Sequence, residues 1–282
     1  MSPHKKAPLD PPDFLYGTAW KEEQTESLTH LAISTGFRGV DTANQRKHYF
    51  EEAVGKGIST ALNQGVCTRE ELFVQTKFTS QPGQDHRLPY DPGAALAIQV
   101  QQSFQSSLEH LRTDYLDSYV LHGPSSSWGW TSADWEVWQA MESIHDSGQV
   151  HHLGVSNVSA PQLRELLGGA RIRPSFVQNR CYARFGWDEE VLTLCRQSGA
   201  RYQGFSLLTA NRAEIARPEI SALAERHGAT AAQVVFAFAR QMDMLPLTGT
   251  RSQAHMRQDL ESRNVTLDPA ELKVVAEVGL GS

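Results

Sequence analysis

Short strand-like runs alternate with longer amphipathic stretches along almost the whole chain, and this alternation constrains the possible fold more than any other feature. The runs are apolar, β-branched or aromatic, whereas the stretches between them repeat apolar residues at helical spacing. We predict eight strands, at residues 14–20, 37–41, 72–78, 115–122, 150–157, 175–182, 201–208 and 244–250. Helices are predicted at residues 21–35, 49–63, 135–146, 161–168, 189–197, 218–228, 229–241, 252–261 and 269–278, with another around the apolar stripe of Val100, Phe104, Leu108 and Leu111.

Regular alternation of this kind predicts parallel strands joined by crossover helices. Eight such units within 282 residues favour a closed (β/α)8 TIM barrel, an α/β fold with peripheral helices, over an open doubly wound sheet. The chain contains no linker-like stretch between units, so we expect a single domain spanning residues 1–282, with a proline-rich, mobile lead at 1–12. In such a barrel, functional residues gather at the carboxyl ends of the strands.

The composition excludes several classes of partner. The formal net charge is −6 and no run of Lys or Arg is present, so we expect no nucleic acid and no membrane surface as partner. No stretch of about 18 apolar residues exists that would span a bilayer. The three cysteines are too few and too scattered for a disulfide framework or a zinc site, so we expect no metal and a reducing, cytoplasmic location.

Four polar residues end or follow the predicted strands. Asp41, Lys77 and His122 end the second, third and fourth strands, and Tyr49 stands at the predicted start of a helix. Each alone has a commoner explanation, because aspartates cap turns, tyrosines pack, lysines are solvated at strand ends and histidines lie at surfaces. Together at one end of a barrel, an acid, a tyrosine, a lysine and a histidine are what proton-coupled carbonyl chemistry requires.

Short motifs occur in order at the ends of the predicted strands. They are GTAW (17–20), VDTA (40–43) with YFEEAVG (49–55), QTKF (75–78), DYLDSYVLHGP (114–124), GVSN (154–157), VQN (177–179), GFSLL (204–208) and TGTRSQAHMRQDL (248–260). In this order they resemble the aldo-keto reductases over most of the chain. The resemblance implies a (β/α)8 barrel that reduces aldehydes and ketones to alcohols with NADPH or NADH and without a metal. No GxGxxG fingerprint of a Rossmann domain is present.

The resemblance also implies catalytic roles for the four polar residues. Tyr49 would protonate the carbonyl oxygen while C4 of the nicotinamide delivers a hydride. A free phenol has a pKa of about 10, and a neighbouring ammonium lowers that pKa by favouring the phenolate. Lys77 would supply the ammonium, and Asp41 would keep Lys77 charged and in place. His122 would hydrogen-bond the carbonyl oxygen and set its orientation.

The spacing of the acid and the tyrosine departs from the family. Tyr49 follows Asp41 by eight positions, three more than in most members. The interval from Tyr49 to Gly55 matches the family, which identifies Tyr49 as the catalytic tyrosine and predicts a bulged loop before it. The candidates to enter the site from this loop are Asn44, Arg46, Lys47 and His48.

Cofactor contacts are implied for the nicotinamide end and the pyrophosphate. Ser156, Asn157 and Gln178 match the positions that hydrogen-bond the carboxamide, since these side chains offer both donors and acceptors; a merely polar rim is the alternative. Phe205 stands where a tyrosine usually stacks on the nicotinamide, and a phenylalanine face can also stack. Ser206 and Leu208 match a short loop over the pyrophosphate, unless this strand end simply packs.

The adenosine end departs most from the family. Gly249 and Thr250 replace the usual Lys–Ser pair. His255 replaces an arginine, and Asp259 stands where an asparagine often meets the adenine. Arg251 either binds a phosphate in a bidentate manner or is a surface charge at the start of a helix. Thr250 and the amides that open this helix also suit a phosphate. The resemblance favours NADPH, with NADH or dual use left open.

Aromatic residues are the candidates for the substrate pocket. Trp20 is expected to form one wall, while Trp128 and Trp130 either cover the mouth or belong to an aromatic cluster packed at the surface. The chain ends soon after its last predicted helix, and the loop after Leu208 is short. We therefore expect an open pocket for aromatic or aliphatic aldehydes and fast exchange of the cofactor.

The predicted function is that of a monomeric NAD(P)H-dependent reductase acting on a small-molecule carbonyl substrate. The alternative on the same fold is a non-catalytic NAD(P)-binding redox sensor or auxiliary subunit, against which the complete set of four polar residues argues. A hydrolase or isomerase would need paired carboxylates, a metal cluster or a glycine-rich phosphate loop, and the sequence offers none that is convincing.

Overall fold

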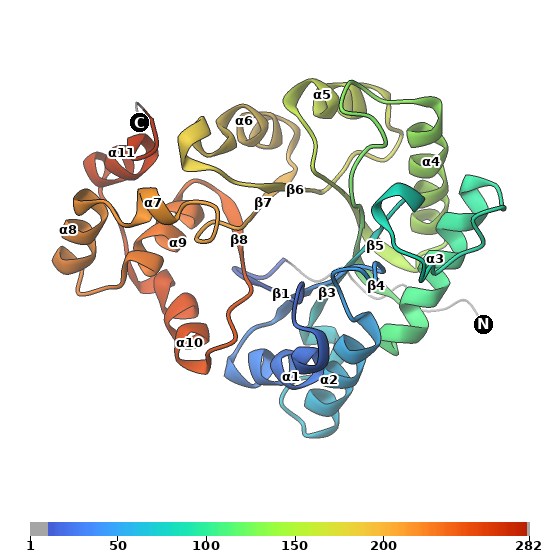
Figure 1. The fold of residues 1–282 in the computed structure, drawn as a ribbon, viewed down its shortest axis with the longest axis horizontal. Coiled ribbons are helices and arrows are strands. Elements are labelled where there is room, and N and C mark those ends of the chain that lie inside the picture. The colour runs from blue at the N-terminus through green and yellow to red at the C-terminus, as the bar shows by residue number, and fades with distance from the viewer. Residues whose placement is uncertain (1–10, 281–282) are drawn as a thin grey trace.

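The computed structural model describes residues 11–280 and contains a closed barrel of eight parallel strands (Figure 1). The α/β barrel predicted from the sequence is therefore confirmed. Neighbouring strands pair in chain order, and β1 pairs with β8 to close the ring. The strands are β1 (Leu15–Gly17), β2 (Gly39–Asp41), β3 (Phe73–Phe78), β4 (Leu116–Leu121), β5 (Val150–Ser156), β6 (Phe176–Arg180), β7 (Arg201–Phe205) and β8 (Met244–Thr248). Most of the lead expected at 1–12 lies outside the described residues.

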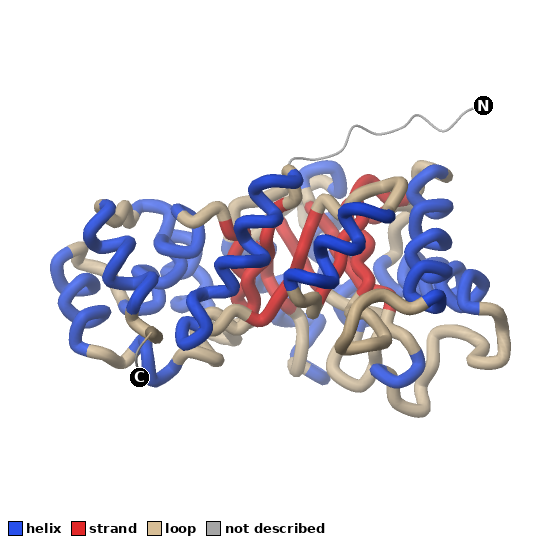
Figure 2. Tube along the Cα trace, turned by 90° about the horizontal axis from the view of Figure 1, so that it is seen from above, coloured by secondary structure: helices blue, strands red, loops and turns tan. Residues whose placement is uncertain are grey.

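Helices fill the connections and lie around the strands, as Figure 2 shows with helices in blue and strands in red. They are α1 (Thr25–Thr35), α2 (Glu51–Asn63), α3 (Leu96–Leu111), α4 (Ser132–Asp146), α5 (Ala160–Gly169), α6 (Glu189–Ser198), α7 (Arg212–Ile215), α8 (Pro218–Arg226), α9 (Ala231–Gln241), α10 (Gln253–Glu261) and α11 (Pro269–Glu277). The short α7 was missed by the sequence analysis. Among the helices of residues 11–280, none combines the length and apolar character needed to cross a membrane.

The predicted start of the second helix was wrong. Helix α2 begins at Glu51, and Tyr49 lies in the loop before it. The amide of Tyr49 donates to the carbonyl oxygen of Gln45 at 3.0 Å, so a separate turn holds the tyrosine. Glu51 and Glu52 occupy the first turn of the helix, where carboxylates interact favourably with the positive end of the helix dipole.

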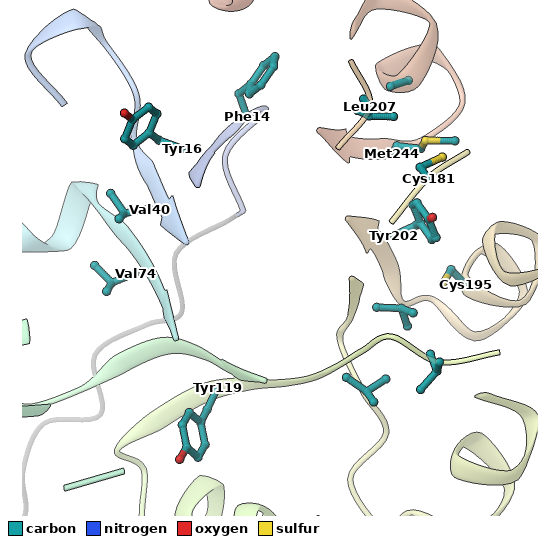
Figure 3. Close-up of a cluster of buried hydrophobic side chains, with 14 of the residues drawn as sticks. Phe14, Tyr16, Val40, Val74, Tyr119, Cys181, Cys195, Tyr202, Leu207 and Met244 are labelled. Carbon is teal, nitrogen blue, oxygen red and sulfur yellow. The ribbon is translucent and has the colours of Figure 1, made fainter. Parts of the chain in front are cut away.

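Alternate side chains of each strand face the helices or the barrel interior. The outward set includes Val40, Val74, Tyr119 and Tyr202, which Figure 3 shows projecting from their strands, and it belongs to the main apolar core. The inward set includes a small, separate apolar cluster that begins at the amino ends of the strands and extends along β8 to Leu247. Its members are Leu15, Phe73, Phe176, Leu245 and Leu247.

The polarity of the barrel interior changes along β3. Phe73, Gln75 and Lys77 share the inward face, because side chains two residues apart in a strand point the same way. All three are fully buried. The interior thus passes from an apolar layer through an amide layer to a charged layer at the carboxyl ends, where barrel enzymes place their active sites.

A close contact between α2 and α3 fixes the helix that follows Tyr49. A Cβ atom added at Gly55 would lie 1.9 Å from the carbonyl oxygen of His110, so no other residue fits without movement of the backbone. Glu51, in the first turn of α2, accepts a hydrogen bond from Thr76 Oγ1 on β3 at 2.5 Å. The helix is therefore held against both its neighbouring helix and the barrel.

Gly55→Ala is expected to lower the free energy of unfolding by about 1–3 kcal/mol, because the new methyl group forces α2 and α3 apart. Gly168→Ala is the matched control, since a Cβ atom there meets nothing within 4 Å and alanine is the better helix former. Urea unfolding followed by circular dichroism measures both variants. Equal stability of the two variants would contradict the close approach of the helices.

Candidate active site

A cavity of about 1130 Å³ opens at the carboxyl ends of the strands. Its lining runs from Asp41, Tyr49 and His122 on one side to the beginning of α10 on the other. Pockets for single drug-sized ligands have volumes of about 300–1,000 Å³. The cavity is therefore large enough for an extended ligand together with a small second molecule.

A buried ion pair lies beneath the cavity. Lys77 Nζ donates to Asp41 Oδ1 at 2.7 Å and to the carbonyl oxygen of Thr42 at 2.8 Å. The Lys77 side chain is fully buried. Burial lowers the pKa of the Lys77 ammonium, and the charges of Asp41 and Glu51 oppose that change. Two of the four predicted catalytic residues are thus in direct contact.

Three glutamines support Asp41, and of these only Gln178 was predicted as a site residue. Asp41 Oδ1 also accepts hydrogen bonds from Gln75 Nε2 at 2.7 Å and from Gln178 Nε2 at 3.0 Å. Gln203 Oε1 accepts from the same two nitrogens, at 2.8 and 2.9 Å, and Gln203 Nε2 donates back to Gln75 Oε1 at 3.0 Å. These three glutamines, which we call the amide layer, hold the carboxylate in place without adding charge.

Tyr49 stands between the ion pair and the predicted histidine. The centre of its ring lies 5.3 Å from Lys77 Nζ and 6.0 Å from the centre of the His122 ring. The ring lines the cavity and is only partly covered, yet the protein around it is dense enough that burial raises the pKa of the phenol, and the charge of Asp41 raises it further. In the free protein the pKa is therefore shifted upward, opposite to the lowering expected from Lys77, because burial and the charge of Asp41 both act in that direction.

His122 lines the cavity beside Tyr49. Its Nδ1 atom lies 2.7 Å from Thr79 Oγ1, a contact that the sequence analysis did not anticipate. Burial lowers the pKa of this imidazole to about 3, with the charges of Lys77 and His48 acting in the same direction. The ring is therefore neutral at physiological pH.

The extra loop residues fold mainly away from the cavity. Asn44 Nδ2 donates to the carbonyl oxygen of Ser103 on α3 at 3.0 Å, and Arg46 pairs with Glu22 at 3.1 Å. Lys47 is exposed. Of the four candidates from this loop, only His48 lines the cavity, where its ring stacks on Trp20 with ring centres 4.1 Å apart.

Ser156, Asn157 and Gln178 lie together at the ends of β5 and β6. Ser156 Oγ donates to the carbonyl oxygen of Gln178 at 2.7 Å, and Asn157 Nδ2 donates to the carbonyl oxygen of His122 at 2.8 Å. Both amide nitrogens face acceptors, since Gln178 Nε2 is held by Asp41 and the amide layer. Among residues 11–280, no donor reaches the amide oxygens of Asn157 and Gln178, so both can accept hydrogen bonds from a ligand.

The end of β7 contributes Phe205, Ser206 and Leu208, all of which line the cavity. Ser206 has a positive φ of 57°, so the chain turns sharply out of the strand. The sequence analysis missed Arg180, whose guanidinium lies 5.5 Å above the Phe205 ring. Arg180 also lines the cavity.

The residues predicted to meet the adenosine line the far end of the cavity. They are Gly249, Thr250, Arg251, His255 and Asp259. Arg251 Nη2 donates to the carbonyl oxygen of Trp20 at 2.5 Å, so this guanidinium bridges two loops at the rim.

Lys21 was not predicted at this end of the cavity. Its Nζ atom donates to the carbonyl oxygen of Gly249 at 2.7 Å. Burial and the charge of Arg251 lower the pKa of Lys21 to about 8.

Asp259 is the buried acid of this region. It is only 4% exposed and accepts a hydrogen bond from Thr248 Oγ1 at 2.7 Å. Burial raises its pKa from 3.8 to about 6, whereas Thr248 and His255 act in the opposite direction. A carboxylate in this position reduces the stability of the fold at neutral pH.

The tryptophans of the predicted pocket behave differently from one another. Trp20 lines the cavity with 61% of its surface exposed. The prediction for Trp128 was wrong, because its side chain is 90% exposed and stands outside the described lining of the cavity. Trp130 is buried against Trp135 and Trp138, and its Nε1 donates to the carbonyl oxygen of Gln162. The surface cluster, which was the alternative explanation, describes Trp130 better.

Comparison with known proteins identifies the family to which the chain belongs. The model of the Aldo/keto reductase family matches residues 15–279. The chain belongs to this family. Glyoxal reductase of Bacillus subtilis is 32% identical over 213 residues, which cover 76% of this chain and 68% of that protein. A probable NAD(P)H-dependent D-xylose reductase of Emericella nidulans is 28% identical over 297 residues, covering 93% and 88% of the two chains.

The fold agrees with solved aldo-keto reductases. The crystal structure of an aldo-keto reductase from Bombyx mori in complex with NADP superposes with a TM-score of 0.80 at 24% identity, over 95% of this chain and 89% of that one. The protein is thus an NAD(P)H-dependent oxidoreductase of the aldo-keto reductase family, which acts on carbonyl compounds. Within residues 11–280, no group of three or more potential metal ligands is present.

Asp259→Asn is expected to stabilise the reductase at pH 8 by about 2–3 kcal/mol, because each unit of pKa difference corresponds to about 1.4 kcal/mol. The folded pKa of this acid lies above the unfolded one, so the wild type loses stability as pH rises through the window from about 4 to 6. The two proteins should converge below pH 4, where the carboxyl group is protonated in both states. Urea unfolding at a series of pH values measures the difference, and a gap that is independent of pH would contradict the raised pKa.

Proposed function

We propose that this reductase converts aldehydes and ketones to alcohols, with hydride transfer from C4 of a reduced nicotinamide and Tyr49 as the proton donor. The observation that carries the proposal is the buried Asp41–Lys77 pair, 2.7 Å between Oδ1 and Nζ, beneath a tyrosine that lines the cavity. His122 lines the same part of the cavity. A carbonyl bound there meets a donor, a cation and a neutral imidazole at once.

The reaction is balanced by one hydride and one proton. A reduced nicotinamide held in the cavity would supply the hydride. The carbonyl carbon would then gain a C–H bond, and its oxygen would gain negative charge. Tyr49 gives its phenolic proton to that oxygen, forming the alcohol. Its raised pKa keeps the phenol protonated until charge develops on the substrate, and an alkoxide is basic enough to take the proton.

The phenolate that remains after proton transfer needs a counter-charge. Lys77 is placed to provide one, with its Nζ atom 5.3 Å from the centre of the Tyr49 ring. Asp41 keeps Lys77 in position, and solvent at the open cavity returns a proton to Tyr49 before the next turnover. His122, being neutral, stabilises the developing oxyanion by a hydrogen bond rather than by charge.

The residues at the ends of β5 to β7 fit a nicotinamide. The amide oxygens of Asn157 and Gln178, which have no donor in the described part of the chain, are acceptors for the N–H groups of its carboxamide. The Phe205 ring offers an apolar face for stacking. Ser206 and Leu208 then lie where a pyrophosphate would follow, and the cavity continues from there to α10.

NADPH is the cofactor that we propose, with NADH as the alternative. Arg251 and His255 line the adenosine end together with Lys21 and provide cationic or donor groups for a 2′-phosphate. The amides that open α10, with Thr250 before them, add neutral donors. Asp259 opposes them, which makes the expected preference for NADPH moderate.

The substrate is a small carbonyl compound of the aromatic or aliphatic aldehyde class. Trp20 and His48 form the outer wall of the cavity, and the exposed Trp20 surface leaves its mouth open. We expect a broad substrate range and fast exchange of the cofactor. We also propose that residues 1–282 act as one catalytic domain, as a monomer and in the reducing cytosol, the last because Cys67, Cys181 and Cys195 are all free thiols.

Tyr49→Phe is expected to lower kcat for an activated aromatic aldehyde by about 100- to 10,000-fold, because the general acid is lost. Loss of the absorbance of the reduced cofactor measures turnover. Tyr115→Phe is the control, since Tyr115 precedes β4 at the opposite end of the barrel. Cofactor binding without turnover in the wild type would contradict catalysis and favour the redox-sensor alternative.

The wild type is expected to bind NADPH about 10-fold more tightly than NADH. A phosphate held by charged donors contributes about 1.5–3 kcal/mol, and repulsion by the Asp259 carboxylate keeps the net preference at the lower end of that range. His255→Ala should weaken the binding of NADPH and leave that of NADH unchanged. Quenching of intrinsic tryptophan fluorescence gives both dissociation constants. An equal loss for the two cofactors would show that His255 does not meet the 2′-phosphate.

A further inference from the structure

Thr79 contacts the histidine of the active site through a hydrogen bond that the mechanism above does not use. Thr79 directly follows β3 and is 4% exposed. Its Oγ1 atom lies 2.7 Å from Nδ1 of His122. Its carbonyl oxygen accepts from Tyr90 Oη at 2.8 Å and from Gln84 Nε2 at 3.3 Å, so the loop after β3 fixes the threonine independently of the histidine.

This hydrogen bond has one chemically satisfactory direction. A hydroxyl carries a proton that needs an acceptor, and a buried donor without one is costly. Within residues 11–280, Thr79 Oγ1 makes no other hydrogen bond. If Nδ1 carried a proton, it would donate to the hydroxyl oxygen. The hydroxyl proton would then have no acceptor among the described residues. Thr79 is therefore the donor and His122 Nδ1 the acceptor.

The direction of this bond determines the other nitrogen of the ring. A neutral imidazole carries one proton, so an accepting Nδ1 requires a protonated Nε2. Within the described residues, Nε2 makes no hydrogen bond, and it is not one of the buried polar atoms that lack a partner. His122 lines the cavity. The Nε2–H group is consequently available to a ligand in the cavity.

We propose that Thr79 is a positioning residue that holds His122 in its Nε2-protonated tautomer, so that the imidazole presents a donor to the substrate carbonyl. The catalytic consequence rests on the proposed function, whereas the tautomer itself does not. In the other tautomer, the Nε2 lone pair would face the carbonyl oxygen and repel the charge that develops there. Thr79 thus selects which of two neutral histidines the site contains.

Long-range ¹H–¹⁵N NMR of the full chain with ¹⁵N-labelled histidine tests the tautomer at neutral pH without cofactor. His122→Asn identifies the resonances of this residue among eleven histidines. The wild type and Thr79→Ser, which keeps the hydroxyl, should show a protonated Nε2 and a bare Nδ1. Thr79→Val, which keeps the shape but loses the hydroxyl, should move part of the population to the Nδ1-protonated form.

The same spectra contain the results that would overturn the assignment. A protonated Nδ1 in the wild type, whether alone or together with a protonated Nε2, overturns it. An unchanged tautomer in Thr79→Val does so as well. If Thr79→Val fails to fold, Thr79→Ala serves as the variant without a hydroxyl, and the wild-type spectrum decides the assignment in any case.

Steady-state kinetics test the consequence for catalysis. Thr79→Val should lower kcat/KM for an aromatic aldehyde by about 10- to 100-fold, somewhat less than the loss of a whole oxyanion donor. The dissociation constant of NADPH should not change, and Thr79→Ser should recover most of the wild-type rate. A wild-type rate in Thr79→Val would overturn the positioning role. Absence of turnover in the wild type itself would count against the proposed function, and the NMR result would then decide the Thr79 assignment alone.

Discussion

The ion pair of Asp41 and Lys77 is the interaction on which the rest of the site depends. Each charge, taken out of water alone, would cost several kcal/mol, and attraction repays that cost only when geometry and further hydrogen bonds are good. Here the lysine is fully buried and donates to the carboxylate and to a backbone carbonyl. The carboxylate in turn accepts from two amide nitrogens as well as from the lysine. Such a pair needs a rigid, closed surrounding, which the barrel interior provides.

The amide layer explains how the barrel accommodates this charge. A second cation beside Asp41 would compete with Lys77, whereas the neutral glutamines donate hydrogen bonds without doing so. Gln203 accepts from both Gln75 and Gln178, so the three side chains behave as one hydrogen-bonded unit. Gln178 both donates to Asp41 and lines the cavity at the proposed carboxamide site. A displacement of Asp41 would therefore move the Gln178 amide, and a displacement of that amide would move Asp41.

Much of the fold and of the site could be predicted because the informative residues lie at strand ends. The eight strands followed from alternation, and the implied cofactor residues line one cavity, since carboxyl ends of parallel strands meet at one face. Gln75 and Gln203 were missed. Each lies two residues before a predicted site residue in its strand, Lys77 in β3 and Phe205 in β7, and this spacing already indicated that their side chains face the barrel interior. The pKa of Tyr49 could not be predicted, because burial depends on residues distant in sequence. The prediction for Trp128 was wrong for a related reason, because a loop has no periodicity from which the direction of its side chains can be predicted.

The extra residues between Asp41 and Tyr49 show how the site tolerates a longer loop. The longer loop is held outside the cavity by the hydrogen bond from Asn44 to the carbonyl oxygen of Ser103 in α3. At its other end, the amide of Trp20 donates to the carbonyl oxygen of His48 at 2.7 Å and fixes the loop beside Tyr49. The insertion therefore adds an imidazole to the cavity while Tyr49 keeps its place in the loop just before α2. Burial and the charge of Lys47 lower the pKa of His48, and Asp85 opposes them. With His122 neutral, the cation beside the Tyr49 ring is Lys77, whose Nζ atom lies 5.3 Å from the ring centre. The buried, paired lysine is thus the counter-charge that the proposed phenolate requires.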